Sequence, residues 1–463
     1  MSNRDVIREL EGVFKDRLIT EPHILALYSH DASSEVGMMP MALVYPESTN
    51  EITTLVKLAI NYGFKLLPVG SSTSLSGNAT PKLGNTVIVA MERMNKIIEV
   101  SDVDWVARVQ PGIKVDDLNL ELTGYELQWP VDPASSKTAT VGGVINNGGG
   151  GMRGAKFGPA AYWVLGLEVM IGTGNVIRVG CRTVKCREGY NLLQLFIGSE
   201  GTLGITTEAT LRLAPLPESF VGLMAEFGNI EPLVNAVINV KRARLWPIIT
   251  EFVDDVTAEV LNLNRKYYLW LGIDTNSGGE RSILEKLRSL IKSNGGDIVN
   301  EADSMQSFMK VLEPRRALYS AGLKYAFNKY GADSVVVWED IAVPISKLPD
   351  AVREIYNLSR KYGMEILLGG HVGDGNLHPG LIFRRNISEE EMRKVSRFIS
   401  EIGEVGIKYG GTPSAEHGIG TMKKELLRAK YRSLNSENAI DIMKRIKEIF
   451  DPHGILNPGK IFD

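Results

Sequence analysis

Two histidines bracket the segment HVGDGNLH at residues 371–378. The letters between them, GDGN at 373–376, favour a tight turn, and apolar runs lie on both sides. If those four residues form the loop, His371 and His378 pair across two antiparallel strands, with Cβ atoms roughly 5 Å apart. Two imidazoles so placed can share one metal ion. A structural histidine pair, or two unrelated surface histidines, is the alternative.

A third histidine stands beside a carboxylate in PSAEHGIG, at residues 413–420. The neighbours of Glu416 and His417 are small, so the backbone there can enter a crowded site. With His371 and His378, Glu416 would complete a set of two nitrogens and one oxygen with open positions, which suits a Lewis-acid ion. His417 would then be left as a general base. A solvated loop pair is the alternative for Glu416 and His417.

Glycine is enriched in the chain: 47 of the 463 residues are glycine, against a usual share of roughly 7%. Three segments concentrate them: PVGSSTSLSG (68–77), TVGGVINNGGGGMRG (140–154) and GSEGTLGITTEATLRL (198–213). Successive small residues let backbone N–H groups point at an anion. The first of them, PVGSSTSLSG, contains neither GxGxxG nor GK[ST], so neither a Rossmann site nor a P-loop is indicated there. Each segment alone indicates only a turn, whereas the three together suggest one large, phosphate-bearing cofactor.

The elements that must hold these segments follow from hydrophobic periodicity. Residues 1 to about 215 read as a mixed α+β unit of short elements, in which 131–161 is a long glycine-rich passage without periodicity. Beyond that point the pattern changes to repeated units of strand, helix and strand, which suggest a ferredoxin-like layer. The three units lie at about 219–253, 266–300 and 334–371. A helical excursion is expected at 302–330, and an amphipathic helix from about 437.

Composition excludes several classes of protein. The chain has 52 Lys+Arg and 55 Asp+Glu, a net charge of -3, which gives no reason to expect nucleic acid as a partner. Cys181 and Cys186 are too few for a disulfide framework, and we expect reduced thiols. No run reaches the roughly 18 apolar residues of a membrane span, and the first residues lack the apolar core of a signal peptide. We therefore expect a cytoplasmic protein.

The order of PVGSSTSLSG, DPASSKTATVGG, NNGGGG and IGSEGTLGITTEA resembles the FAD-binding domain of the vanillyl-alcohol-oxidase flavoprotein superfamily. The resemblance implies that the first loop holds the pyrophosphate and that later segments line the isoalloxazine and ribityl chain. The FAD contacts implied in this way are Gly70, Ser71, Ser72, Thr73, Ser74, Thr140, Gly142, Gly143, Asn147, Glu200, Gly204, Ile205 and Asn457. Some members tether FAD through His or Cys; the first loop contains neither, so we expect noncovalent FAD.

The motifs HVGDGNLH and EHGIG are similar to those of the superfamily's D-2-hydroxyacid branch, which includes D-lactate dehydrogenases, D-2-hydroxyglutarate dehydrogenases and the flavin subunits of glycolate oxidases. The resemblance runs from about residue 40 to 462. It implies a divalent metal, zinc favoured over manganese or iron, on His371, His378 and Glu416, with His417 as the base. It also implies an arginine for the substrate carboxylate; in EPRRALYSAG, Arg316 is preferred to Arg315.

The implied fold is α+β. It has a two-part FAD-binding domain of the vanillyl-alcohol-oxidase type at 1–215, and a substrate (cap) domain with the metal site at 216–415. The cap domain would contain a large antiparallel sheet of ferredoxin-like repeats covered by helices. A C-terminal segment at 416–463 would return to the FAD domain.

The implied reaction is metal-assisted oxidation of a small D-2-hydroxy acid, D-lactate favoured, to the 2-oxo acid, with hydride passing to flavin N5. The electron acceptor would be a quinone, a cytochrome or an iron–sulfur subunit rather than oxygen. Alternatives are the flavin subunit of a multi-subunit glycolate oxidase, a D-2-hydroxyglutarate dehydrogenase, and a non-enzymatic electron-transfer subunit, against which the intact histidine and glutamate set argues. Peripheral association with the inner face of the membrane and a homodimer stay open.

Overall fold

The computed structural model describes residues 3–463, and the chain divides into two compact units. The first contains the residues up to Gly150, Pro159–Leu216 and Glu416–Asp463; the second contains Gly151–Gly158 and Pro217–Ala415. The sequence prediction assigned 151–158 to the first domain, whereas here they join the second unit. Two contacts explain this: Trp246 Nε1 donates to the carbonyl of Ala155, and Lys156 forms an ion pair with Asp274.

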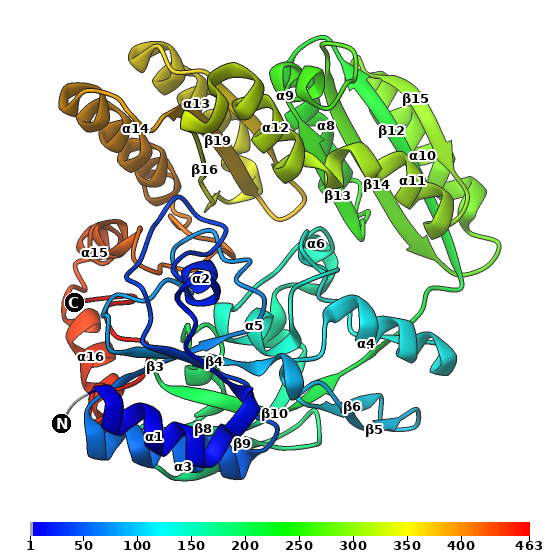
Figure 1. Ribbon diagram of the computed structural model, residues 1–463. Coiled ribbons are helices and arrows are strands. Elements are labelled where there is room, and N and C mark those ends of the chain that lie inside the picture. The colour runs from blue at the N-terminus through cyan, green and yellow to red at the C-terminus, as the bar shows by residue number, and fades with distance from the viewer. Residues whose placement is uncertain (1–2) are drawn as a thin grey trace. The chain divides into compact units, whose positions relative to one another are not determined.

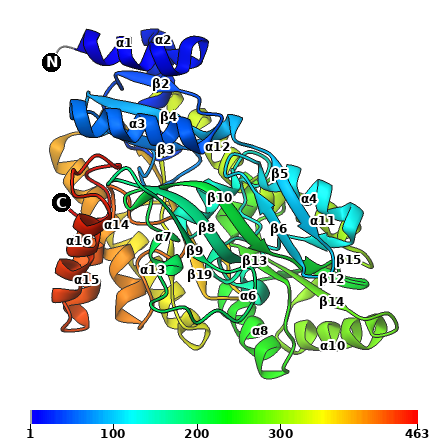
Figure 2. The same ribbon diagram turned by 90° about the horizontal axis from the view of Figure 1, so that it is seen from below.

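The first unit begins with a four-stranded sheet in the order β1-β2-β4-β3. Its strands are β1 (Leu18–Ile19), β2 (Ala42–Val44), β3 (Lys65–Val69) and β4 (Thr86–Ala90). Helix α3 (Thr49–Tyr62) lies along β3 and β4 (Figure 2) and buries an apolar face against them. Ser48 caps its first turn by accepting from the N–H of Glu51, and Gly63 ends it in the left-handed region, at φ 74°.

An antiparallel sheet of five strands forms the rest of the first unit, in the order β5-β6-β10-β8-β9, with a separate β7–β11 pair. These strands are β5 (Ile97–Ser101), β6 (Val106–Val109), β7 (Leu127–Gln128), β8 (Val164–Ile171), β9 (Val176–Gly180), β10 (Gly204–Arg212) and β11 (Ala214–Pro215). Within the passage expected to lack periodicity, Val141–Asn147 forms helix α5. Its N-cap, Thr140, accepts from the N–H of Gly143, and the burial of Val141, Val144 and Ile145 in the apolar core adds to this capping against the low helix propensity of its glycines.

The second unit is built on one antiparallel sheet in the order β15-β12-β14-β13-β18-β19-β16, with β17 paired to β19 (Figure 1). Its strands are β12 (Ser219–Phe227), β13 (Ile249–Val253), β14 (Tyr267–Thr275), β15 (Asp297–Ala302), β16 (Ser334–Trp338), β17 (Ile341–Ala342), β18 (Ile366–His371) and β19 (Asn376–Arg384). The three repeats of strand, helix and strand predicted from the sequence supply all of these strands except β19, with β17 as an additional short strand in the third repeat, and the α+β fold class is confirmed.

Helices cover both faces of this sheet. One face packs in a single apolar core with α8 (Ile230–Arg242), α10 (Glu280–Ser293), α13 (Leu348–Tyr362) and α14 (Glu389–Lys408). The other face meets α11 (Met305–Arg316) and α12 (Leu318–Tyr330), the predicted helical excursion. Because strand side chains alternate between faces, Phe252 points into the first core and its neighbour Glu251 points toward α11.

The remaining helices are short or lie at the ends of the units. They are α1 (Asn3–Phe14), α2 (Pro22–Leu25), α4 (Val115–Leu122), α6 (Gly154–Phe157), α7 (Leu193–Phe196), α9 (Asp255–Val260), α15 (Lys424–Ser433) and α16 (Asn438–Phe450), the last matching the predicted C-terminal helix. None of the helices within residues 3–463 is both long and apolar enough to cross a membrane.

The prediction of reduced thiols was wrong, because Cys181 and Cys186 are joined as a disulfide. Their Cα atoms lie 6.1 Å apart, within the span that a disulfide bridges. The reason is local: the chain after β9 turns back on itself within five residues, so the two side chains meet. Spacing in the sequence could not show that turn.

Phe308 fills the space left by two glycines on the α11 face of the sheet. It is fully buried, and a Cβ at Gly222 or Gly272 would meet its ring. We expect Phe308→Ala to destabilise the second unit by about 3–5 kcal/mol, since removing a large aromatic group leaves a cavity. Thermal unfolding followed by circular dichroism measures this. The matched control is Phe327→Ala, whose ring is 60% exposed; an equal loss in both variants would contradict the packing argument.

Candidate active site

His371 ends β18 and His378 lies near the start of β19, on the face of the sheet that meets α11 and α12. The strand register differs from the predicted one, because Gly369, not His371, is the partner of His378. A shift of two residues keeps both side chains on one face. The histidines are therefore diagonal neighbours, with ring centroids 5.0 Å apart, and both are buried. The predicted pairing was wrong in register and right in bringing the two imidazoles together.

A buried carboxylate orients the first of these histidines. Glu251 on β13 is the cross-strand partner of His371, and its Oε1 lies 2.7 Å from His371 Nδ1. Its Oε2 lies 2.8 Å from the guanidinium of Arg315, the penultimate residue of α11. Glu251 is fully buried and Arg315 nearly so. Burial of a charge is costly unless it is paired, so these three side chains form one compensated cluster.

The second histidine has a different environment. His378 Nδ1 lies 3.3 Å from the backbone carbonyl of Glu339 and 3.8 Å from Oδ1 of Asp340. Asp340 is fully buried, and Asn376 Nδ2 donates to its Oδ1 at 2.7 Å. Asp340 Oδ2 accepts from the N–H of Ala415 at 2.7 Å, which ties the end of the second unit to the histidine strands.

The donor set within the second unit fits a divalent cation. Two imidazoles are gathered there with the buried carboxylates of Glu251 and Asp340 and the backbone carbonyl of Glu339, and in both rings the Nδ1 atom faces an oxygen. A ring nitrogen occupied in this way leaves Nε2 as the atom that can ligate a metal. Sequence reasoning missed the three acids, although an acidic pair directly after the apolar strand SVVVW was a visible signal.

The two candidate arginines of α11 are not equivalent. Arg315 is buried and held by Glu251, whereas Arg316 is half-buried at the last position of the helix. Ser320, one turn later, is exposed and donates to the carbonyl of Ala317.

In the first unit, the predicted pyrophosphate loop packs against the start of α5. A Cβ at Gly70 would overlap the Thr140 side chain, so only glycine allows this approach. Ser71 donates to the carbonyl of Thr138, and Ser72 adopts the left-handed region at φ 52°. Gly142 lies against Pro111, whose Cβ would be 2.5 Å from an added Cβ.

The glycine-rich segments also present polar groups that suit a polar cofactor. Among residues 3–463, Ser76 Oγ, Asn78 Oδ1 and Ser199 Oγ are buried and without a hydrogen-bond partner. Buried polar atoms normally have partners, so their presence in or beside the first and third glycine-rich segments fits a group such as FAD. Gly204 and Ile205 lie at the start of β10, and Ile205 points into the apolar core, so its side chain is used for packing.

The segment 416–420 belongs to the first unit and is held by residues predicted to contact FAD. Asn147 Nδ2 donates to the carbonyl of Glu416, and Asn147 Oδ1 accepts from Asn78 Nδ2 at 2.8 Å. Glu200 Oε1 accepts from the N–H groups of Ile419 at 2.7 Å and Gly420 at 3.0 Å. The loop that carries His417 is therefore fixed directly beside the predicted flavin segments.

We call the hydrogen bonds from Asn147 and Glu200 to segment 416–420 the clamp, and Glu200 is its unusual residue. It adopts the left-handed region at φ 55° and is buried. Burial raises its pKa to about 7, while hydrogen bonds from Gly420 and Ile419 and the charge of Lys460 oppose the rise. Asn457 supports the Glu200 backbone, because Asn457 Nδ2 donates to the Glu200 carbonyl at 2.7 Å.

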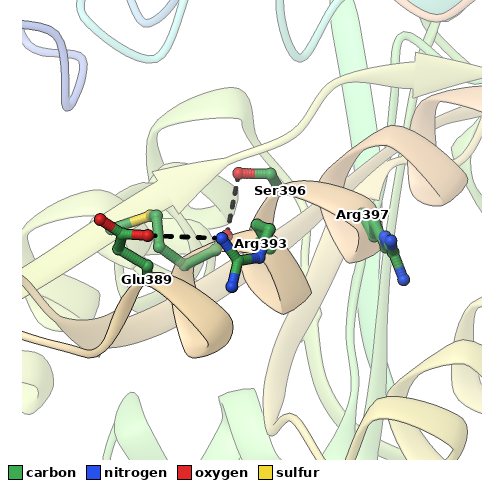
Figure 3. A pocket seen from close by; sticks show the side chains of 5 residues that line it. Glu389, Arg393, Ser396 and Arg397 are labelled. Carbon is green, nitrogen blue, oxygen red and sulfur yellow. Dashed lines mark hydrogen bonds and ion pairs between the residues drawn. The ribbon is translucent and has the colours of Figure 1, made fainter.

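A shallow hollow on α14 is a separate surface feature (Figure 3). It is lined by Glu389, Met392, Arg393, Ser396 and Arg397, with Arg393 bonded to Glu389 at 3.4 Å. All five residues come from one helix, and none belongs to the groups described above. The hollow is therefore not part of the candidate site.

Two family models match most of the chain. Residues 40–180 match the family model described as "FAD binding domain", and residues 216–461 match "FAD linked oxidases, C-terminal domain". The chain is 35% identical to the glycolate oxidase subunit GlcD of Bacillus subtilis, over 94% of this chain and 92% of that one. It is 31% identical to a D-lactate dehydrogenase of Anaerostipes hadrus, over 99% and 97% of the two chains.

A solved structure shows the same fold at low identity. Substrate-bound p-cresol methylhydroxylase superposes with a TM-score of 0.78 at 16% identity, over 99% of this chain and 97% of that one. The likeness supports the architecture and says nothing about the substrate of this chain.

The raised pKa of Glu200 predicts a pH-dependent stability. Between its ordinary pKa of 4.5 and about 7, the folded state keeps a proton that the unfolded state has lost, so stability falls as pH rises through this window. Glu200→Gln should remove about 3 kcal/mol of this pH-dependent change in the free energy of unfolding, since one pKa unit equals about 1.4 kcal/mol. Denaturant unfolding at pH 5 and pH 8 measures it. Glu121→Gln, an exposed carboxylate of the same unit, should leave the slope unchanged.

Proposed function

We propose that this chain, which belongs to the FAD-linked oxidases and to the D-2-hydroxyacid branch of the vanillyl-alcohol-oxidase flavoproteins, oxidises a small D-2-hydroxy acid to the 2-oxo acid. The observation that carries the proposal is the buried histidine pair, His371 and His378, set among carboxylates in the second unit. Such a donor set, in a chain that also matches an FAD-binding domain, suits metal-assisted oxidation of an alcohol.

His371 and His378 would hold the divalent ion, and the sequence adds Glu416 as the third ligand. When bound, the ion would lower the pKa of the substrate hydroxyl. Two imidazoles and one carboxylate suit zinc, manganese or iron, and we favour zinc. Arg316, preferred from the sequence motif, would bind the substrate carboxylate in a charge-assisted pair, and Arg315 is paired with Glu251.

His417 would accept the hydroxyl proton at a ring nitrogen. Its support is the clamp on segment 416–420, since Asn147 and Glu200 hold the backbone on either side of His417. A base held by the backbone in this way loses little entropy when the substrate binds. When bound, FAD would supply the acceptor for the hydride that leaves C2; noncovalent attachment is expected.

D-lactate is the favoured substrate, by similarity to a D-lactate dehydrogenase. The 35% identity to a glycolate oxidase subunit supports a second candidate, in which the chain is the flavin subunit of a multi-subunit glycolate oxidase. A copurifying iron–sulfur subunit would favour that candidate. The chain is also 29% identical to a D-2-hydroxyglutarate dehydrogenase of Stutzerimonas stutzeri over the full length of both chains, so D-2-hydroxyglutarate belongs in any substrate panel. The electron acceptor in each case would be a quinone, a cytochrome or an iron–sulfur protein.

Turnover with a dye acceptor tests the substrate and the metal together. We expect activity with D-lactate, or with another D-2-hydroxy acid, to exceed activity with its L-enantiomer. Chelation should abolish turnover and leave FAD bound, because the proposed ligands are not among the residues predicted to contact FAD. His378→Ala should bind less metal than the wild-type chain, as measured by elemental analysis. Full metal content and normal turnover in His378→Ala would rule out the histidine site.

His417→Asn tests the proposed base. A positioned general base contributes about 10²–10⁴-fold, so turnover per bound FAD should fall within that range. Metal content and the flavin spectrum should stay unchanged. The control is His453→Asn, an exposed histidine of the same C-terminal segment, which should keep wild-type turnover. If the His417 variant turned over normally per flavin, the residue would only pack against its neighbours.

A further inference from the structure

The structure assigns Glu251 the role of a positioning residue that fixes the tautomer of His371. Glu251 lies on a strand distant in sequence from both histidines, and no motif of the chain points to it. Where it concerns metal binding, the inference rests on the proposed function. Where it concerns the protonated nitrogen of His371, it stands on the geometry of the second unit alone.

The contact is close and fully buried. Glu251 and His371 are cross-strand partners on β13 and β18, and Oε1 lies 2.7 Å from Nδ1. The other oxygen, Oε2, lies 2.8 Å from the Arg315 guanidinium. A carboxylate in an ion pair with a guanidinium can only accept hydrogen bonds. In the neutral imidazole of His371, Nδ1 must therefore carry the proton and donate it to Oε1, which leaves the Nε2 lone pair unprotonated.

The second histidine reaches the same tautomer by a different route. His378 Nδ1 faces the backbone carbonyl of Glu339 at 3.3 Å, and a carbonyl also only accepts. The two imidazoles would thus both present Nε2 to a metal. Of these two contacts, only the one at His371 is made by a side chain. A substitution at Glu251 should change His371 and leave His378 as it is, which makes His378 an internal control.

An amide side chain at position 251 would no longer favour the Nδ1–H tautomer of His371. Glutamine has nearly the same shape, but its NH₂ group can donate to Nδ1 and so stabilise the Nε2–H tautomer, which cannot ligate a metal through Nε2. It would also leave Arg315 without its ion-pair partner. A carboxylate that orients a ligating histidine typically changes metal affinity by about 10–100-fold when it is lost.

The test is nuclear magnetic resonance of the metal-free protein labelled with ¹⁵N-histidine. The chain has only 6 His, and His371→Ala assigns the signal. We expect Nδ1–H at His371 in the wild type, and a shift toward Nε2–H in Glu251→Gln, with His378 unchanged. Glu251→Asp, which keeps the charge, should retain the Nδ1–H form and guards against a Gln variant that fails to fold. Glu226→Gln, a carboxylate elsewhere on the same sheet, should alter neither ring.

Metal affinity gives the second readout. Competition with a chelator should show a loss of about 10–100-fold in Glu251→Gln and a smaller loss in Glu251→Asp. A wild-type His371 that is Nε2–H or doubly protonated at neutral pH, or a tautomer indifferent to Glu251→Gln, overturns the inference. A chain with the expected tautomers that oxidises no D-2-hydroxy acid would instead reject the proposed function, so the two failures are separate results.

Discussion

The ion pair between Arg315 and Glu251 is the interaction on which the histidine site depends. A carboxylate with no exposure to solvent is stable as an anion only beside a cation and a hydrogen-bond donor, and Arg315 and His371 supply these from α11 and β18. The pair therefore joins three elements that are separate in sequence. It also gives the helical excursion one role, because α11 supplies a guanidinium to the face of the sheet that carries the histidines.

In the first unit, hydrogen bonds to the backbone hold the segment that carries His417. The segment 416–420 contains glycines in the left-handed region, Gly418 at φ 83° and Gly420 at φ 52°, and its N–H groups need acceptors. Glu200 accepts two of them, and Asn147 donates to the carbonyl of Glu416. Residues that the sequence assigns to cofactor binding thus also hold the loop of the proposed base. Flavin binding and placement of the base would then depend on the same few side chains.

Much of the architecture could be predicted from the sequence. Apolar periodicity predicted the three strand–helix–strand repeats and the helical excursion, because each of these elements buries a local apolar stripe. The register of the histidine hairpin was missed by two residues. The turn letters GDGN do not show that Asn376 already belongs to β19, where its amide donates to Asp340.

The groups around the histidines were harder to predict for a physical reason. Glu251 is a single acid within an apolar strand, and Asp340 is the second of two acids that follow one; their partners come from distant segments. A short window of sequence does not distinguish a single acid such as Glu251 from a solvated one. The disulfide between Cys181 and Cys186 was missed in the same way, since only the fold of the loop brings the two side chains together.

The central claim is that the histidine pair holds an ion needed for oxidation of a D-2-hydroxy acid by the bound flavin. Anaerobic mixing of the purified protein with a single D- or L-hydroxy acid, without any external acceptor, tests it most directly. If the histidine pair holds this ion, the D-enantiomer should bleach the visible absorption of the flavin in the metal-loaded protein and fail to do so after chelation. Bleaching that is equal with both enantiomers, or equal with and without metal, would contradict it.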